Sequence, residues 1–128
     1  MSKIKIATLN VDGIKDNVKR NQIFKLLKKT NYDIICLQET HIEEQNIEKV
    51  KREWNMESRW NQAPMAYSGG AAILMGNQKK IKITDVKKGK MGRIITVKLK
   101  IDEEEIQIVN IYGPNKPGQR EFFFSRNG

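Results

Sequence analysis

The sequence contains one cysteine, one histidine and no long hydrophobic run. The cysteine count and the lack of a long apolar run each exclude a class of protein. The single cysteine, Cys36, excludes a disulfide framework and favours a reducing, intracellular compartment. No apolar run approaches the length of a membrane span, and the N-terminus lacks a signal-peptide hydrophobic region, so no membrane segment is expected. No internal repeat or low-complexity linker interrupts the 128 residues, which we expect to form one domain or part of one.

What the sequence does contain is positive charge. Lysine and arginine together number 24 against 15 aspartates and glutamates, which gives a net charge of +9 and a pI of about 9.7. Such an excess attracts polyanions, with nucleic acid first and an anionic membrane second. The alternative is a lysine-rich surface that serves only solubility. With 38% hydrophobic and 30% charged residues, the chain is expected to be soluble and globular.

The first forty residues predict a β-α-β unit. Residues 3–10 alternate apolar and polar side chains, as a strand with one face inward does. Residues 16–29 place apolar side chains near helical spacing, and Asp16 can cap that helix. Residues 34–38 begin with four consecutive apolar side chains, the pattern of a strand buried on both faces. A strand, a helix and a second strand in this order favour parallel pairing of the two strands.

The rest of the chain predicts a second helix and then several strands. Residues 43–54 carry acids early and bases late, which suits a helix dipole. Short strands are expected at residues 71–75 and 81–86. The segments 93–101 and 105–113 alternate on either side of an acidic turn and predict a β-hairpin.

The sharpest candidate for chemistry is Glu39, in the segment DIICLQETH. Its carboxylate follows a buried strand, and a buried carboxylate needs a proton, a cation or a metal. A carboxylate at a rigid strand end is a natural ligand for Mg²⁺, which needs one or two carboxylates plus substrate phosphate. An equally weighted alternative is a capping or ion-pairing role ahead of the helix that begins at Glu43.

Polar residues also stand at the ends of two other predicted strands. Asn10 could orient Glu39, coordinate a metal or bind phosphate, or it could serve only the turn in NVDG. Tyr112 could donate a hydrogen bond to phosphate, although a tyrosine at a strand end more often packs. Asn110 and Asn115 belong to the same exit, and Asn115 is more often a turn residue. Because strand ends converge at sites in α/β sheets, the three exits could face one pocket.

Four further residues are candidates for contact with nucleic acid. His41 could act as a general base or contact phosphate, but one histidine on a polar loop is more often a surface residue. Lys87, Lys88 and Lys90 fall in KKGKMG, which we expect to be a basic loop. They could touch a phosphate backbone, and a solvated loop would look the same.

Five segments in order, IKIATLNVDGI, DIICLQETH, SGGAAIL, GRIITVKL and VNIYGPN, resemble the endonuclease/exonuclease/phosphatase superfamily. Within it they look most like the apurinic-like endonuclease domain of LINE-type (non-LTR) retrotransposons, related to exonuclease III. The resemblance runs from about Lys3 to Asn115, and LQETH together with NIYGPN at this separation is its specific part.

The resemblance implies a role for each matching residue. Glu39 matches the glutamate that binds Mg²⁺ or Mn²⁺, and Asn10 matches an active-site asparagine near the metal. Tyr112 and Asn115 match the pair that contacts the scissile phosphate. It also implies a DNA substrate and a nuclear or cytoplasmic location.

The same resemblance identifies what is missing. The family continues with an Asp-x-Asn pair that activates water and ends with a Ser-Asp-His segment, and residues 116–128 contain neither. We therefore expect an α/β fold that is the N-terminal half of a four-layer αββα sandwich, a mixed and mostly antiparallel sheet with flanking helices, in a single truncated domain over residues 1–128. Its one sheet is expected to leave a face uncovered, which would favour self-association.

The expected function is Mg²⁺-dependent hydrolysis of DNA phosphodiesters, inactive or weak for this chain alone. Three alternatives stay open. One is a non-catalytic, basic remnant that binds nucleic acid, the second is a phosphatase of the same superfamily acting on lipid or inositol phosphates, and the third is an α/β fragment without a role.

Overall fold

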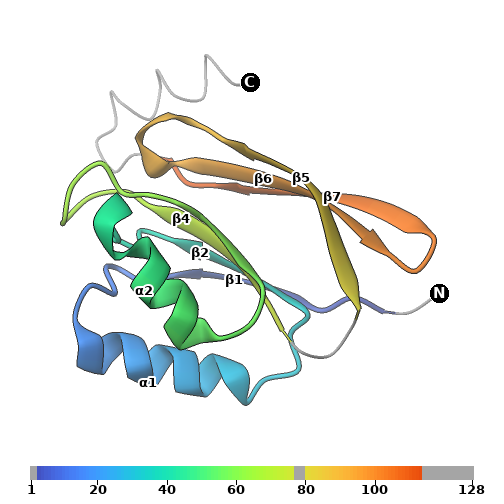
Figure 1. Cartoon of the computed structure of the whole chain (residues 1–128), viewed down its shortest axis with the longest axis horizontal. Coiled ribbons are helices and arrows are strands. Elements are labelled where there is room, and N and C mark those ends of the chain that lie inside the picture. The colour runs from blue at the N-terminus through green and yellow to red at the C-terminus, as the bar shows by residue number, and fades with distance from the viewer. Residues whose placement is uncertain (1–2, 77–79, 114–128) are drawn as a thin grey trace.

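The computed structural model describes residues 3–76 and 80–113, and it begins with the expected β-α-β unit (Figure 1). Strand β1 (Ile6–Asn10) pairs in parallel with β2 (Ile34–Gln38), and helix α1 (Asn17–Lys28) connects them. The carboxylate of Asp16 accepts the backbone N–H of Lys19 at 2.8 Å, so the predicted cap is confirmed.

The first sheet is completed by two antiparallel strands. Helix α2 (Glu44–Trp54) leads into β3 (Ser58–Asn61) and then β4 (Ala71–Met75), and the strand order is β1-β2-β4-β3. Every side chain of β4 is buried, and so are the first four of β2. Central strands of this kind have continuous apolar sequences because both of their faces are covered.

A second sheet of three antiparallel strands follows. It contains β5 (Ile81–Lys88), β6 (Ile94–Ile101) and β7 (Glu104–Ile111), and a short 3₁₀ turn, η1 (Lys90–Gly92), joins the first two. The predicted hairpin between residues 93 and 113 is confirmed as β6 and β7. The predicted basic loop is wrong in part, because Lys87 and Lys88 are the last residues of β5 and pair with β6; Lys90 lies in the turn.

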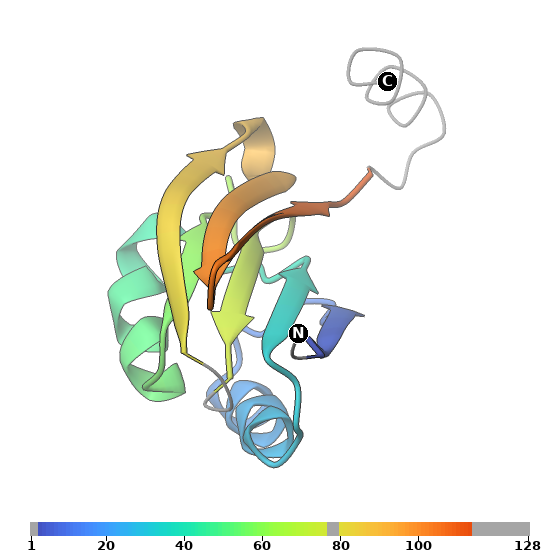
Figure 2. The ribbon, with the colours of Figure 1, turned by 90° about the vertical axis from the view of Figure 1, so that its right-hand side faces the viewer.

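The two sheets face each other, and both helices cover the far side of the first sheet (Figures 1 and 2). The expected α/β class and half-sandwich are confirmed. The expectation of one sheet with an uncovered face is wrong, because the strands after β4 fold back over β2 and β4 instead of extending their sheet. Alternation within β6 predicted one buried face but could not say which layer would cover it.

Two hydrophobic cores fill the spaces between the helices and the two sheets. Between the helices and the first sheet, the rings of Phe24 and Trp54 meet edge to face at 5.3 Å. Between the sheets the core consists of aliphatic side chains and Cys36, whose burial raises the pKa of its thiol to about 11. The sheet-facing members of this second core are Ile34, Cys36, Ala71, Ile73, Met75, Ile95, Val97 and Leu99. None of the helices among residues 3–76 and 80–113 is long and apolar enough to cross a membrane.

Two buried asparagines join the sheets through polar contacts. The Nδ2 of Asn110 on β7 donates to the carbonyls of Leu37 and Ala72, each at 2.9 Å. Its Oδ1 accepts the side-chain amide of Gln38 at 2.7 Å. At the other side of the sandwich, Asn61 Nδ2 donates to Gly89 and Ile94 carbonyls, each at 2.9 Å. Asn110, grouped from sequence with the residues of a strand exit, is thus a structural link that places β7 over β2 and β4.

We predict that Asn110→Ala lowers the free energy of unfolding by about 1–3 kcal/mol, because it removes the amide that satisfies two carbonyls between the sheets. Urea denaturation followed by circular dichroism measures the change. Gln107→Ala on the exposed face of the same strand is the matched control and should stay within about 0.5 kcal/mol of the unmodified chain. Equal effects of the two substitutions would contradict the linking role.

Candidate active site

Three loops meet at one end of the first sheet. The loop after β1 contacts the loop after β2 through backbone hydrogen bonds, Gly13 N–H to Glu39 O at 2.7 Å and Ile14 N–H to Thr40 O at 2.9 Å. The segment before β4 contacts the same loop from the other side, because His41 N–H donates to Gly69 O at 2.9 Å. The residues around Glu39 are therefore held between two neighbouring loops.

The backbone of this turn brings Glu39 and His41 together. Both residues have positive φ angles, 57° and 60°, which are uncommon for residues other than glycine. Both side chains consequently lie on the same side of the turn, and His41 Nε2 lies 2.6 Å from Glu39 Oε2. The side chains are 15% and 11% exposed. Sequence reasoning gave His41 a low weight as a lone histidine on a polar loop, because periodicity alone does not predict the left-handed turn that brings it to Glu39.

Other donors complete the surroundings of the Glu39 carboxylate. The backbone N–H of Gly69 donates to Oε2 at 3.2 Å, and the side chain of Tyr112 forms a hydrogen bond with the carboxylate. Glu39 does not cap α2, since the N-cap residue is Glu43, so the alternative role as a helix cap is wrong. An ion pair with His41 remains compatible with the structure.

These contacts shift the pKa values of Glu39 and Tyr112. Burial raises the pKa of Glu39, but the hydrogen bonds from Tyr112, His41 and Gly69 outweigh it and hold the pKa below its usual value of 4.5. Burial and the hydrogen bond to Glu39 raise the pKa of Tyr112 to about 12, against an opposing effect of Arg93. At neutral pH the site therefore holds an ionised carboxylate beside a protonated phenol.

Asn10 is the last residue of β1, and its side chain closes the turn that follows the strand. Its Oδ1 accepts the backbone N–H of Asp12 at 2.9 Å, which is the turn role proposed as an alternative. In register it pairs with Gln38, the residue before Glu39. Asn10 is exposed, so its amide group can also face a ligand.

Arg93 is a residue of the site that sequence reasoning missed. Its guanidinium lies over the Tyr112 ring, 5.9 Å from the centroid, and Tyr112 N–H donates to Arg93 O at 3.0 Å. The Nη1 atom is buried and has no hydrogen-bond partner within the described parts of the chain. A guanidinium with an unsatisfied donor next to a carboxylate site is suited to bind an anion. In the sequence the residue was one basic position among 24.

Close packing at glycines brings the turn between β5 and β6, which carries Lys90, against the turn that contains Glu39. A Cβ on Gly92 would lie 2.5 Å from Gly70 N, and a Cβ on Gly69 would lie 2.7 Å from Met91 O, so these backbones pack directly on each other. The turn that carries Lys90 consequently lies beside the loop that hydrogen-bonds Glu39. Lys87, Lys88 and Lys90 are exposed.

The oxygen donors present fit a hard divalent cation held by few ligands. The chain between residues 3 and 113, apart from 77–79, has no cluster of three or more His, Cys, Asp or Glu that could hold a metal. Mg²⁺ does not require one, because it is commonly bound through one or two carboxylates with substrate phosphate and water. Glu39 and the amide oxygen of Asn10 are the candidate ligands. Asn115, the other predicted site residue, lies outside the described residues.

Comparison with known proteins gives consistent matches. Residues 7–126 match the endonuclease/exonuclease/phosphatase family. The chain is 25% identical over 115 residues to an exodeoxyribonuclease of Bacillus subtilis, covering 88% of this chain and 43% of that protein. It is 30% identical over 117 residues to a DNA-(apurinic or apyrimidinic site) endonuclease of Dictyostelium discoideum, covering 89% and 31%. The chain thus spans less than half the length of both relatives.

A solved structure shows the same fold. The catalytic domain of Xenopus laevis APE2 superimposes with a TM-score of 0.63 and 17% sequence identity, and the match covers 92% of this chain and 48% of that domain. At this identity the likeness concerns the fold alone.

We predict that the stabilisation provided by the Glu39 carboxylate is lost in acid. Because its pKa in the folded state lies below the ordinary value, Glu39 stabilises the fold above that value, and the contribution disappears as the pH falls through the folded-state pKa. Glu39→Gln should therefore be less stable than the unmodified chain near pH 7, and the difference should shrink towards about pH 3.

The measurement is the free energy of unfolding in urea across that pH range. Glu48→Gln removes one carboxylate from an exposed position of α2 and serves as the control, with no comparable dependence. A difference between unmodified chain and Glu39→Gln that does not change with pH would contradict the assignment.

Proposed function

Because the chain belongs to the endonuclease/exonuclease/phosphatase family, we propose that its Glu39 site serves the metal-dependent hydrolysis of DNA phosphodiesters. One observation carries the proposal. An ionised carboxylate at a strand exit lies beside a protonated tyrosine and an arginine with an unsatisfied donor. A carboxylate can hold a cation, while a phenol and a guanidinium can hold a phosphate.

Each residue has a distinct part in this proposal. Glu39 and Asn10 hold the divalent cation, Mg²⁺ or Mn²⁺, which supplies neutralisation of charge on the phosphate. Tyr112 donates a hydrogen bond to Glu39 in the absence of substrate and turns it towards a phosphate oxygen when substrate is present. Arg93 binds a second oxygen through its guanidinium group, and Asn115 is assigned to the phosphate by resemblance. His41 keeps the Glu39 carboxylate oriented through the 2.6 Å contact.

DNA is the proposed substrate for two reasons. Both curated relatives are named as DNA nucleases, and the net charge of +9 favours a polyanion. Lys87, Lys88 and Lys90 extend the positive surface from the Glu39 turn along the β5–β6 hairpin. The resemblance of five sequence segments to the endonuclease domain of LINE-type retrotransposons adds to the proposal a protein of that origin with a nuclear or cytoplasmic location.

We also propose that residues 1–128 form one truncated domain and that this segment alone is inactive or weak. It contains no Asp-x-Asn or Ser-Asp-His segment after Asn115. Loss of a general base lowers a rate by about 10²–10⁴-fold. Self-association, which the sequence analysis expected through an uncovered sheet face, is the remaining part of the proposal.

Two alternatives differ in what they predict. A basic, non-catalytic remnant binds nucleic acid with a steep salt dependence and is indifferent to Glu39→Ala. A phosphatase of the same family turns over a small phosphate ester. The exposed lysines favour the polymer over the small ester.

We predict that any nicking of supercoiled plasmid by the chain in Mg²⁺ is weak and disappears with EDTA or with Glu39→Gln. Calorimetric titration with Mn²⁺ gives a second readout, since Glu39→Gln should weaken binding by about tenfold or more. Glu48→Gln is the control for both measurements. Vigorous nicking would contradict the proposed weakness of residues 1–128 alone, and nicking that survives Glu39→Gln would contradict the role of Glu39.

A separate prediction concerns Arg93. Arg93→Gln should weaken binding of duplex DNA uniformly across sequences and lower the slope of log K against log salt by about 0.9, because it removes one phosphate contact. Lys100→Gln removes the same charge from the far end of β6 and should leave the slope unchanged. Fluorescence anisotropy over a series of salt concentrations measures both variants. Equal slopes for Arg93→Gln and the unmodified chain would exclude this contact.

A further inference from the structure

Two turns carry exposed apolar side chains at the end of the molecule that holds the Glu39 turn (Figure 1). The first turn, residues 65–68 between β3 and β4, is closed by Ser68 N–H, which donates to Met65 O at 3.4 Å. Tyr67 stands on this turn and is 77% exposed, more than any other large hydrophobic residue in the described part of the chain. The second turn is η1, where Met91 is 54% exposed.

The two turns pack against each other through the backbone of glycines. A Cβ at Gly69 would lie 2.7 Å from Met91 O. A Cβ at Gly92 would lie 2.5 Å from Gly70 N. Because Tyr67 precedes Gly69 by only two residues, the two Cα atoms lie within about 7 Å of each other. Tyr67 and Met91 therefore belong to one exposed patch, the Tyr67–Met91 patch.

This patch borders the groups that are proposed to hold a phosphate. Gly69, two residues after Tyr67, donates its N–H to Glu39 Oε2 at 3.2 Å. Arg93, the proposed phosphate ligand, follows Met91 by two residues. A phosphate held between Glu39 and Arg93 would consequently bring the attached sugar and base beside the Tyr67–Met91 patch.

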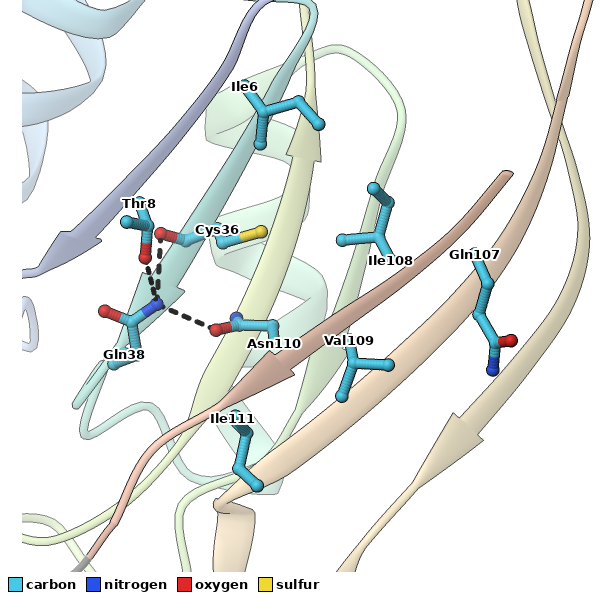
Figure 3. Close-up of a pocket in the computed structure, with 9 residues that line it drawn as sticks. All are labelled: Ile6, Thr8, Cys36, Gln38, Gln107, Ile108, Val109, Asn110 and Ile111. Carbon is cyan, nitrogen blue, oxygen red and sulfur yellow. Dashed lines mark hydrogen bonds between the residues drawn. The ribbon is translucent and has the colours of Figure 1, made fainter. Parts of the chain in front are cut away.

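Positive charge adjoins the patch. Lys87, Lys88 and Lys90 are exposed and precede Met91 at the end of β5 and in η1. Lysines next to exposed aromatic side chains are typical of surfaces that bind both the backbone and the bases of nucleic acid. The described residues that line the groove between β1, β2 and β7, of about 410 Å³, include no lysine or arginine (Figure 3). The apolar surface that is suited to a polyanion is therefore the Tyr67–Met91 patch.

The backbone conformation of Met91 also favours a role in binding. Its φ angle of 62° lies in the left-handed region, which glycine adopts without strain and a methionine rarely adopts. The Met91 side chain is largely exposed, so burial in a core does not offset the strain. Residues in such conformations cluster at functional sites.

We propose that Tyr67 and Met91 form a platform for an unpaired base of the nucleic acid whose phosphate lies at the Glu39 site. The inference rests on the DNA substrate of the proposed function and adds its structural class, single-stranded or locally unpaired DNA. A base within a duplex has both faces covered by its neighbours, so the Tyr67 ring can stack only on a base that has left the duplex stack. Since every base has an aromatic face, this contact does not select a sequence.

The first test is the affinity of the chain for a labelled single strand of roughly twelve nucleotides, measured by fluorescence anisotropy in EDTA. Tyr67→Ala should weaken binding about 5–100-fold, because stacking on one base is lost. Tyr67→Phe keeps the ring and should bind within about twofold of the unmodified chain. Met91→Ala should cause a smaller loss, about two- to fivefold.

Two controls accompany this measurement. None of these substitutions removes a charge, so the slope of log K against log salt should stay that of the unmodified chain. Tyr32→Ala removes a tyrosine that is 38% exposed at the opposite end of β2 and should leave the affinity unchanged. Circular dichroism verifies that each variant is folded.

The second test removes the bases in place of the ring. A strand of tetrahydrofuran residues has the same phosphates but offers no base to stack on. The unmodified chain and Tyr67→Ala should bind this strand equally, because the ring and the base act through one contact. A duplex of the first sequence should respond less to Tyr67→Ala than the single strand does.

Failure of this inference and failure of the proposed function give different results. Equal affinities of Tyr67→Ala and the unmodified chain for the single strand would overturn the inference, while nicking that depends on Mg²⁺ and Glu39 would still support the nuclease. A loss of equal size on the strands with and without bases would also overturn it, because Tyr67 would then not act through a base.

Two further results concern the partner itself. No binding of either strand by the unmodified chain would overturn both the platform and the DNA substrate. Binding of phosphatidylserine vesicles in place of DNA, lost in Tyr67→Ala, would assign the Tyr67–Met91 patch to a membrane surface and overturn the inference.

Discussion

The contacts of one buried amide decide where the second sheet lies on the first. Asn110 satisfies carbonyls of both β2 and β4, and it can do so only when β7 lies above them in one register. That register carries Tyr112 to Glu39, because the two residues follow Asn110 and Leu37 at the same interval. The candidate site therefore depends on this link, and a shift of β7 by one residue would turn Asn110 to the other face of its sheet.

The chemistry at Glu39 depends on the backbone as much as on the side chains. A carboxylate at the end of a buried strand is costly unless donors surround it. Positive φ angles at Glu39 and His41 turn both side chains the same way, and Gly69 contributes its N–H because the segment before β4 approaches the turn closely. The result is an ionised group with a lowered pKa in a largely buried place. Such a group is available to a cation without first losing a proton.

The surface is divided between protected and unprotected strand edges. Lysines along β5 keep that edge hydrated and at the same time extend the positive charge that surrounds the Glu39 turn. On the opposite side, β1 has no charged residue, β7 has none after Glu105, and exposed apolar side chains lie on both strands.

Local sequence patterns determined most of the secondary structure of this protein. The β-α-β unit, the cap at Asp16, the second helix and the β6–β7 hairpin all follow from periodicity and turn chemistry, which act over a few residues. Glu39 was likewise a candidate from the sequence, because a carboxylate that follows a buried apolar strand needs a proton, a cation or a metal beside it. Tertiary structure alone decided that the last three strands form a second sheet and that Asn110 is buried between the layers. It also decided that His41 contacts Glu39 and that Arg93 lies against Tyr112. Those features join residues far apart in the chain or rest on left-handed turns, and no periodicity in a sequence records either.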